Sequence, residues 1–155
     1  MPTKRRRRPS LNQTRVEVRA VILVDGRLVI HRERQVDGVH CSLPGGRVKH
    51  GEGILDALVR EVSEETGLLI DPDRLLYIAE VLSGRGVHDL NLVFLAHLRA
   101  TSARTADLEL LDLDDPAAPS VRPPCINRIR QGVEDDWSAT PEWLGNVSDE
   151  QLGVS

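Results

Sequence analysis

The chain has 155 residues, of which 40% are hydrophobic and 28% are charged, and its formal net charge is −4. This length suffices for one domain with a buried core, and the composition is that of an ordinary soluble protein. The longest apolar run, AVILV at 20–24, is far too short to cross a bilayer and excludes a transmembrane helix.

The chain begins with five consecutive basic residues, Lys4 to Arg8. No apolar segment follows them, so this start is not a secretory signal, and we expect residues 1–14 to form a disordered basic arm. Such an arm can touch nucleic acid or an anionic surface. No basic patch with interleaved aromatic residues follows, however, so the sequence does not favour a dedicated nucleic-acid binder.

The first predicted strands form a hairpin. RVEVRAVILV at 15–24 alternates and then becomes apolar, as a strand entering a core does. Asp25-Gly26 is a strong hairpin turn signal, and RLVIH at 27–31 is expected to pair back. We expect a polar loop at 32–40 (RERQVDGVH), followed by a short extended piece, CSL.

A glycine-rich turn, Pro44-Gly45-Gly46, precedes a predicted helix at 53–66. The helix is indicated by an amphipathic i, i+3, i+4, i+7 stripe, and Gly67 follows as a C-cap. The stripe consists of Leu55, Leu58, Val59 and Val62.

The same helix places three glutamates, Glu61, Glu64 and Glu65, together on one flank. Like charges at this spacing cost helix stability, which Arg60 can partly offset by pairing with Glu64. A cluster of hard carboxylate oxygens is also what Mg²⁺ or Mn²⁺ prefers. On an arbitrary helix, a solvated acidic face would be the simpler interpretation.

Beyond the helix, strands are predicted at 74–83 and 87–99, with a shorter one near 107–113. In the second strand, alternate residues share one face: Leu90, Leu92, Phe94, Ala96 and Leu98. A proline-rich connection at 114–124 and a helix at about 125–134 complete the order β-β-β-α-β-β-β-α, which indicates a mixed sheet covered by helices. The two cysteines, Cys41 and Cys125, fit a reducing cytoplasm, where we expect the protein to act.

One pattern links the glycine turn to the glutamates: G, five residues, E, seven residues, R-E-aliphatic-x-E-E-x-G-aliphatic. The positions that fit are Gly46, Glu52, Arg60, Glu61, Val62, Glu64, Glu65, Gly67 and Leu68. Every fixed position of the Nudix hydrolase signature agrees, and the chain resembles this family over residues 15–135. Cys41 stands where members commonly carry an aromatic residue, which weakens assignment to any subfamily.

The resemblance implies an α/β (α+β) fold, an α-β-α sandwich with a mixed central sheet and the Nudix loop-helix-loop. We expect a basic arm at 1–14, the hydrolase domain at 15–135 and an acidic C-terminal tail at 136–155 that associates with the domain. The implied activity is Mg²⁺-dependent cleavage of a phosphoanhydride bond in a small nucleotide derivative, with Mn²⁺ as a substitute. No membrane partner is expected.

The resemblance also assigns residues. It implies metal ligands at Glu61, Glu64, Glu65 and the carbonyl of Gly45. It implies catalytic roles for Glu61, Glu64 and Arg60, with Arg60 orienting a glutamate, and substrate binding by Arg32, Gly45 and Gly46. Glu52 is expected to brace the loop. The general base is left open between a helix glutamate, Glu61 or Glu64, and a later acid, Asp107 or Glu109.

Several alternatives stay open. A Nudix-like module can bind a nucleotide as a regulator without turnover, although three intact metal carboxylates argue against that. The arginine arm suits an RNA 5′-end pyrophosphohydrolase. A homodimer is also open, since many small members dimerise. Trp137 and Trp143 are interpreted as hydrophobic anchors of the tail or as groups that stack on a base.

Overall fold

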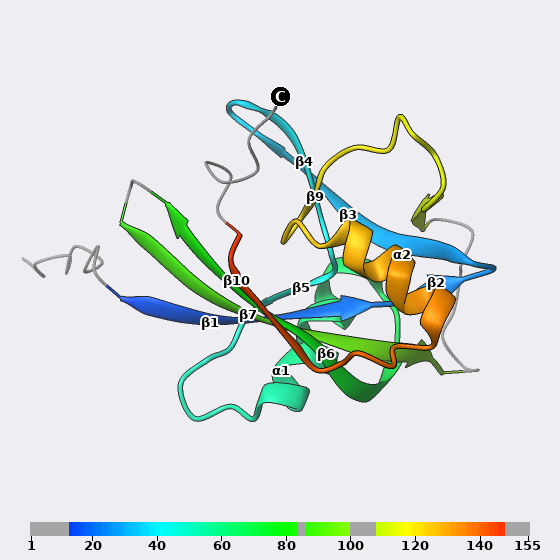
Figure 1. The fold of residues 1–155 in the computed structure, drawn as a ribbon. Helices are drawn as coiled ribbons and strands as arrows, with labels where there is room; N and C mark the ends of the chain where they lie inside the picture. Colours follow the sequence, from blue (N-terminus) through cyan, green and yellow to red (C-terminus); the bar gives the residue numbers. More distant parts are fainter. Residues whose placement is uncertain (1–12, 84–85, 100–107, 148–155) are drawn as a thin grey trace, which may run out of the picture.

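The computed structural model describes residues 13–83, 86–99 and 108–147 (Figure 1). The chain forms ten strands and two helices in these described ranges. In chain order they are β1 (Thr14–Val21), β2 (Leu23–Val24), β3 (Arg27–Gln35), β4 (Gly38–Ser42), β5 (Gly45–Arg47), α1 (Ile54–Thr66), β6 (Ile70–Ser83), β7 (Val87–Leu98), β8 (Glu109–Leu111), β9 (Val121–Arg122), α2 (Ile126–Asp135) and β10 (Glu142–Asn146).

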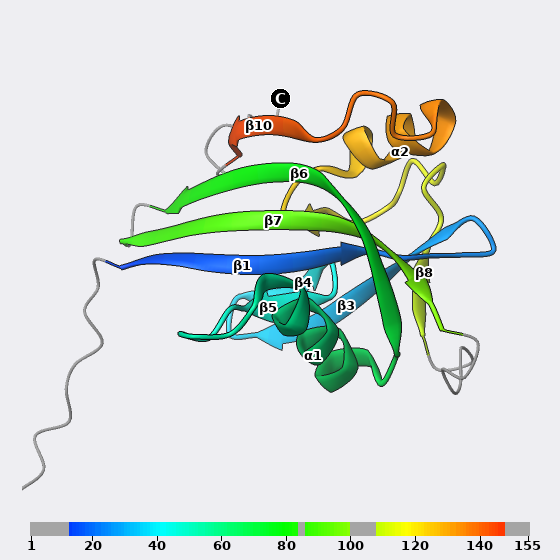
Figure 2. The same cartoon turned by 90° about the horizontal axis from the view of Figure 1, so that it is seen from below.

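A five-stranded mixed sheet forms the centre, in the order β10-β6-β7-β1-β5. β1 runs parallel to β7 and β10 parallel to β6, whereas the β6–β7 and β1–β5 pairs are antiparallel. Figure 2 shows α1 and α2 on opposite sides of this sheet. The predicted α+β fold with a mixed sheet between helices is confirmed.

A second sheet packs beside the first, in the order β2-β3-β4-β9, with β8 pairing with β3. The sequence prediction of a polar loop at 32–40 is wrong here, because β3 continues to Gln35 and β4 already begins at Gly38. Most of these residues are exposed on both faces of the hairpin, so the apolar alternation that marks a half-buried strand is missing. Only the backbone ladder between β3 and β4 defines them as strands.

The core has two parts, one on each face of the central sheet. On the α1 side, Leu58 and Val62 are fully buried in one cluster with Val18 and Ala20 of β1 and with Ile22, which follows β1. Leu55, predicted to belong to the buried stripe, is instead 48% exposed, and its neighbour Ile54 packs against the core. Burying a leucine such as Leu58 contributes about 1.5–3 kcal/mol, so this face fixes α1 beneath the sheet.

From Leu92 to Ala96, β7 is apolar on both faces, because both faces of the sheet are covered there. Leu92 and Phe94, from the predicted face, pack partly buried on the α1 side. Val93 and Leu95 point the other way and are buried on the α2 side with Ile129. The alternation from Leu90 to Leu98 predicted the strand correctly. It predicted one buried face, whereas the structure buries residues on both faces.

The end of the described chain returns to the central sheet. β10 pairs with β6, and the Val147 N–H donates to the Glu80 carbonyl at 2.8 Å. Trp137 is buried and meets the ring of Tyr77 edge-on at 6.5 Å, whereas Trp143 is 57% exposed. Neither helix in the described part of the chain is long and apolar enough to span a membrane.

Candidate functional site

A cavity of about 610 Å³ opens between the two sheets. Its lining comes from β1, β7 and β6 of the central sheet, from the β3–β4 hairpin, from β5 and from α1. Carboxylates, guanidinium groups and two histidines dominate this lining. The cavity is therefore a polar site at the edge of the central sheet.

The backbone of Gly45 and Gly46 on β5 forms one side of the cavity. Gly45 has a φ of +148°, and a Cβ there would overlap the carbonyl oxygen of Val18 on β1. A Cβ on Gly46 would lie 2.5 Å from the carboxyl carbon of Glu61. Only glycine fits at position 45. At position 46 a side chain would displace the Glu61 carboxylate, so the absence of a Cβ there lets this carboxylate of α1 approach the backbone of β5 closely.

α1 holds its three glutamates at different depths. Glu61 and Glu65 lie one turn apart on the same helix face and both line the cavity. The side chain of Glu61 is 18% exposed, whereas that of Glu64 is 59% exposed. The structure therefore brings Glu61 and Glu65 together with Gly45 and Gly46, and it places Glu64 outside the lining on the solvent side of the helix.

Arg60 ties these carboxylates to the preceding loop. Its Nε and Nη2 donate to the two carboxylate oxygens of Glu52 at 2.6 and 2.9 Å, which is a bidentate pair. Its Nη1 donates to Glu61 at 3.0 Å and to Glu64 at 3.2 Å. Arg60 does not belong to the cavity lining. Its contacts are those of a residue that orients glutamates.

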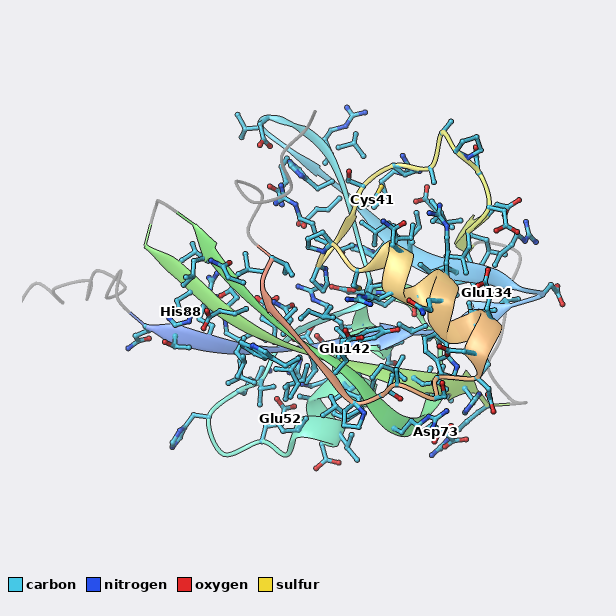
Figure 3. The ribbon with its side chains drawn as sticks, viewed as in Figure 1. Cys41, Glu52, Asp73, His88, Glu134 and Glu142 are labelled. Atoms are coloured by element: carbon cyan, nitrogen blue, oxygen red, sulfur yellow. The ribbon has the colours of Figure 1, made fainter. Side chains whose placement is uncertain are left out.

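Two carboxyl groups of this region have perturbed pKa values. The Arg60 guanidinium, and then the Lys49 amide that donates at 3.0 Å, lower the pKa of Glu52 to about 2. Figure 3 shows Glu52 beside the start of α1. Burial raises the pKa of Glu65, and the Gly45 N–H, which donates to it at 3.1 Å, opposes that rise.

Charged residues of β1 and β7 form the floor of the cavity. Arg15 makes a bidentate pair with Asp89, at 2.5 and 2.8 Å. Arg19 donates to Glu17 at 2.5 Å and to the carbonyl oxygens of Leu43 and Gly45 at 3.1 and 3.4 Å. Arg19 thus holds the backbone segment that carries the glycines.

The sequence analysis missed these floor residues, although a signal was present. In RVEVR, residues Arg15, Glu17 and Arg19 alternate with Val16 and Val18. A central strand that is apolar on one face and charged on the other indicates a polar cavity over its second face. The family signature spans Gly46 to Leu68 and contains no residue of this strand.

Two predicted site residues, Arg32 and Glu109, lie outside the cavity lining. Arg32 is absent from the cavity lining, and its Nε donates to Glu109 on β8 at 2.9 Å. Because side chains alternate along a strand, His31 and Glu33 of β3 line the cavity and Arg32 points away from it. The predicted substrate contact by Arg32 is therefore not supported. Asp107, the other downstream acid, lies outside the described residues.

The α1 end of the cavity carries carboxylates that could hold a divalent cation. Within the described ranges, no three His, Cys, Asp or Glu side chains are gathered into one metal-binding set. Glu61 and Glu65 nevertheless present hard carboxylate oxygens to one cavity, and the missing Cβ of Gly46 lets the Glu61 carboxylate lie against β5. In donor chemistry, this end of the cavity fits such an ion.

Comparison with known protein families identifies one match. The family model described as NUDIX domain covers residues 13–118, more than half of the chain. A solved structure of a MutT NUDIX hydrolase from Burkholderia pseudomallei superposes with a TM-score of 0.60 and 31% identity. This match covers 70% of the present chain and 90% of the Burkholderia chain.

Two curated relatives are also similar. An ADP-ribose pyrophosphatase of Methanocaldococcus jannaschii is 31% identical over 107 residues, which make up 64% of this chain and 63% of that protein. The 8-oxo-dGDP phosphatase NUDT18 of Mus musculus is 48% identical over 54 residues, 35% of this chain and 16% of the mouse protein. The chain thus spans less than two thirds of the length of these curated relatives.

Proposed function

The chain belongs to the Nudix hydrolase family, and we propose that it is a Mg²⁺-dependent pyrophosphohydrolase acting on a small nucleotide derivative. Its substrate is a nucleoside diphosphate linked to a further group X, or a nucleoside triphosphate. Water attacks one phosphorus and the bridging P–O bond breaks, which gives a nucleoside monophosphate and phosphate, pyrophosphate or phosphorylated X.

The observation that carries this proposal is the convergence of Glu61 and Glu65 with the glycine backbone of β5 in one polar cavity. Family members generally use divalent metal ions, and carboxylate oxygens are the ligands that Mg²⁺ prefers. The names of the two curated relatives describe cleavage of phosphoanhydride bonds by those proteins, which supports the same reaction class here.

A bound cation would neutralise the phosphate oxygens and lower the pKa of an attacking water. Glu61 and Glu65 hold it in this proposal, and Glu64 joins them when its exposed side chain turns from Arg60 towards the cavity. The Gly45 N–H orients Glu65, while Arg60 orients Glu61. A glutamate of α1, Glu61 or Glu64, takes the proton of the attacking water in this proposal. Glu109 pairs with Arg32 outside the cavity lining, and Asp107 lies outside the described residues.

The test is a panel of nucleoside triphosphates, nucleotide sugars, CDP-alcohols and dinucleotides, incubated with the purified chain and Mg²⁺, Mn²⁺ or EDTA. Chromatography should show a nucleoside monophosphate with either metal and none with EDTA. If every compound stays intact while some raise the melting temperature, the chain binds nucleotides without turnover and the proposal is wrong.

A further inference from the structure

Asn91 on β7 is unusual among the described residues. It is the one polar residue that is buried there, with 4% of its surface exposed, and it lines the cavity. No hydrogen bond of its side-chain amide to another described residue is present. Its amide atoms reach the space of the cavity and are not sealed inside the protein. The amide of Asn91 can therefore pair with a molecule that enters the cavity.

The neighbours of Asn91 explain why its amide is unpaired. Directly across the ladder on β6 stands Ala79, which carries no polar group. On the other side, Glu17 of β1 is engaged by Arg19 at 2.5 Å. Two residues earlier on the same strand face, Asp89 is bound by Arg15. Every polar side chain in these flanking positions is already paired with another residue.

The position of Asn91 along the cavity indicates which part of a substrate it meets. Gly45 and the carboxylates of α1 lie at the β5 edge, and β7 is two strands away, roughly 10 Å at the usual strand spacing. Beyond Asn91, the lining becomes apolar at Val81, Val87 and Val147. Phosphates bound at the carboxylate end would thus place the organic part of a nucleotide over β7 and β6.

The lining contains no Phe, Tyr or Trp in the part of the chain that the structure describes. Stacking on an aromatic ring is therefore not available within this lining, and recognition there depends on hydrogen bonds and aliphatic contacts. A carboxamide offers a donor and an acceptor side by side, which matches a base edge with the complementary pair.

We propose that Asn91 is a specificity-determining residue that recognises the nucleobase of the substrate through a bidentate hydrogen bond. The base presents an adjacent donor and acceptor, as the amino and ring-nitrogen edge of adenine does, and its faces lie against the valines. This inference rests on the proposed function, since it places the phosphates at the α1 carboxylates.

The experiment compares the wild-type protein with Asn91→Leu and Asn91→Asp. ADP-glucose, GDP-glucose and UDP-glucose vary the base at constant X, and ADP-ribose varies X at constant base. Asn91→Leu should lower kcat/KM for the nucleotide sugar with the preferred base roughly 10- to 100-fold. The kcat/KM values for the three bases should then become nearly equal. Asn91→Asp, which has only acceptors, should shift the preference towards guanine.

The melting temperature distinguishes a role of Asn91 in base recognition from a role in folding. Because the amide has no partner in the fold, Asn91→Leu should keep or raise the melting temperature. Gln131→Leu, on the exposed surface of α2, is the matched amide-to-leucine control and should leave every ratio unchanged. Unchanged base ratios in Asn91→Leu would overturn the proposal, as would a change confined to the ADP-ribose to ADP-glucose ratio.

A failure of the proposed function is distinguishable from a failure of this inference. If the wild-type protein hydrolyses none of the compounds, binding of AMP, GMP and UMP is measured by calorimetry. A base preference that is present in the wild type and lost in Asn91→Leu supports the inference without catalysis. Equal affinities in the two proteins, or no base preference in the wild type, contradict it.

Discussion

The missing Cβ of Gly46 determines how near Glu61 can come to β5. Because an added Cβ would lie 2.5 Å from the Glu61 carboxyl carbon, Gly46→Ala must displace that carboxylate. We expect kcat to fall about 10- to 100-fold, on the scale of losing one well-placed electrostatic group, with little change in circular dichroism. Gly53→Ala is the control, since its Cβ would meet only the flexible end of Asp56. Equal activities of the two variants would contradict this role.

Cys125 gives a prediction about chemical reactivity. Burial raises the pKa of its thiol to about 12, so almost no thiolate exists at neutral pH. In a Cys41→Ala background, Cys125 should react with a disulfide reagent only after denaturant is added, as followed by absorbance. Rapid modification of the folded protein would show that this part of the α2 core is open.

Individual side chains were the least predictable features. Glu61 and Glu65 could be identified because they belong to a spaced pattern on one helix. Arg32 was expected to bind substrate, but its side chain pairs with Glu109 and its neighbours His31 and Glu33 line the cavity, because adjacent side chains of a strand point in opposite directions. Asn91 could not be found, because burial without a partner is a property of three neighbouring strands and not of any local sequence.

The loop before α1 and the helix itself are joined by the Glu52–Arg60 pair. The folded-state pKa of Glu52 is depressed from 4.5 to about 2, so its contribution to stability is present above pH 4.5 and is lost as the pH falls towards 2. Glu52→Gln should therefore lower the melting temperature at pH 7 and have progressively less effect at lower pH. Thermal denaturation between pH 2.5 and pH 7 measures this difference.

Glu134→Gln, on the exposed face of α2, serves as the reference for this series. Its melting temperature should follow that of the wild type at each pH. If Glu52→Gln and Glu134→Gln behave alike, or if the effect of Glu52→Gln grows as the pH falls, the pair does not stabilise the loop as described.

Helices and central strands followed closely from the sequence, and peripheral strands did not. α1 was predicted at 53–66 and spans Ile54–Thr66, because its apolar spacing and the Gly67 C-cap both act locally. The β3–β4 hairpin and β10 were missed. Residues 32–40 are largely exposed and become strands through the backbone ladder between β3 and β4. β10 becomes a strand through pairing with the distant β6.

The proposed function needs only the cavity, and this can be tested at the level of the whole chain. The cavity residues among the described ones lie between Arg15 and Val147, and the basic residues Lys4 to Arg8 lie outside the described residues. Deleting residues 1–9 should leave kcat/KM on free nucleotides within about twofold. If the protein instead acts on RNA 5′ ends, the deletion should weaken that activity and flatten its salt dependence. Such a result would show that RNA, and not a free nucleotide, is the substrate.

The cavity itself is a property of the assembled molecule. It forms where β5, α1, the floor of β1 and β7 and the β3–β4 hairpin meet, although β1 ends at Val21 and β7 begins only at Val87. The sequence pattern predicted the reaction class from the α1 side of the cavity alone. The other sides, which would contact the remainder of a substrate in the proposed function, are visible only in the fold.

Turnover by the glutamine variants of α1 tests the central claim most directly. On the best substrate of the panel with Mg²⁺, Glu61→Gln, Glu64→Gln and Glu65→Gln should each lower kcat by about 100-fold or more, while Glu134→Gln remains at the wild-type rate. The melting temperature of Glu64→Gln should hardly change, since that side chain is largely exposed. Full activity in all three variants would show that the carboxylates of α1 do not carry out the reaction.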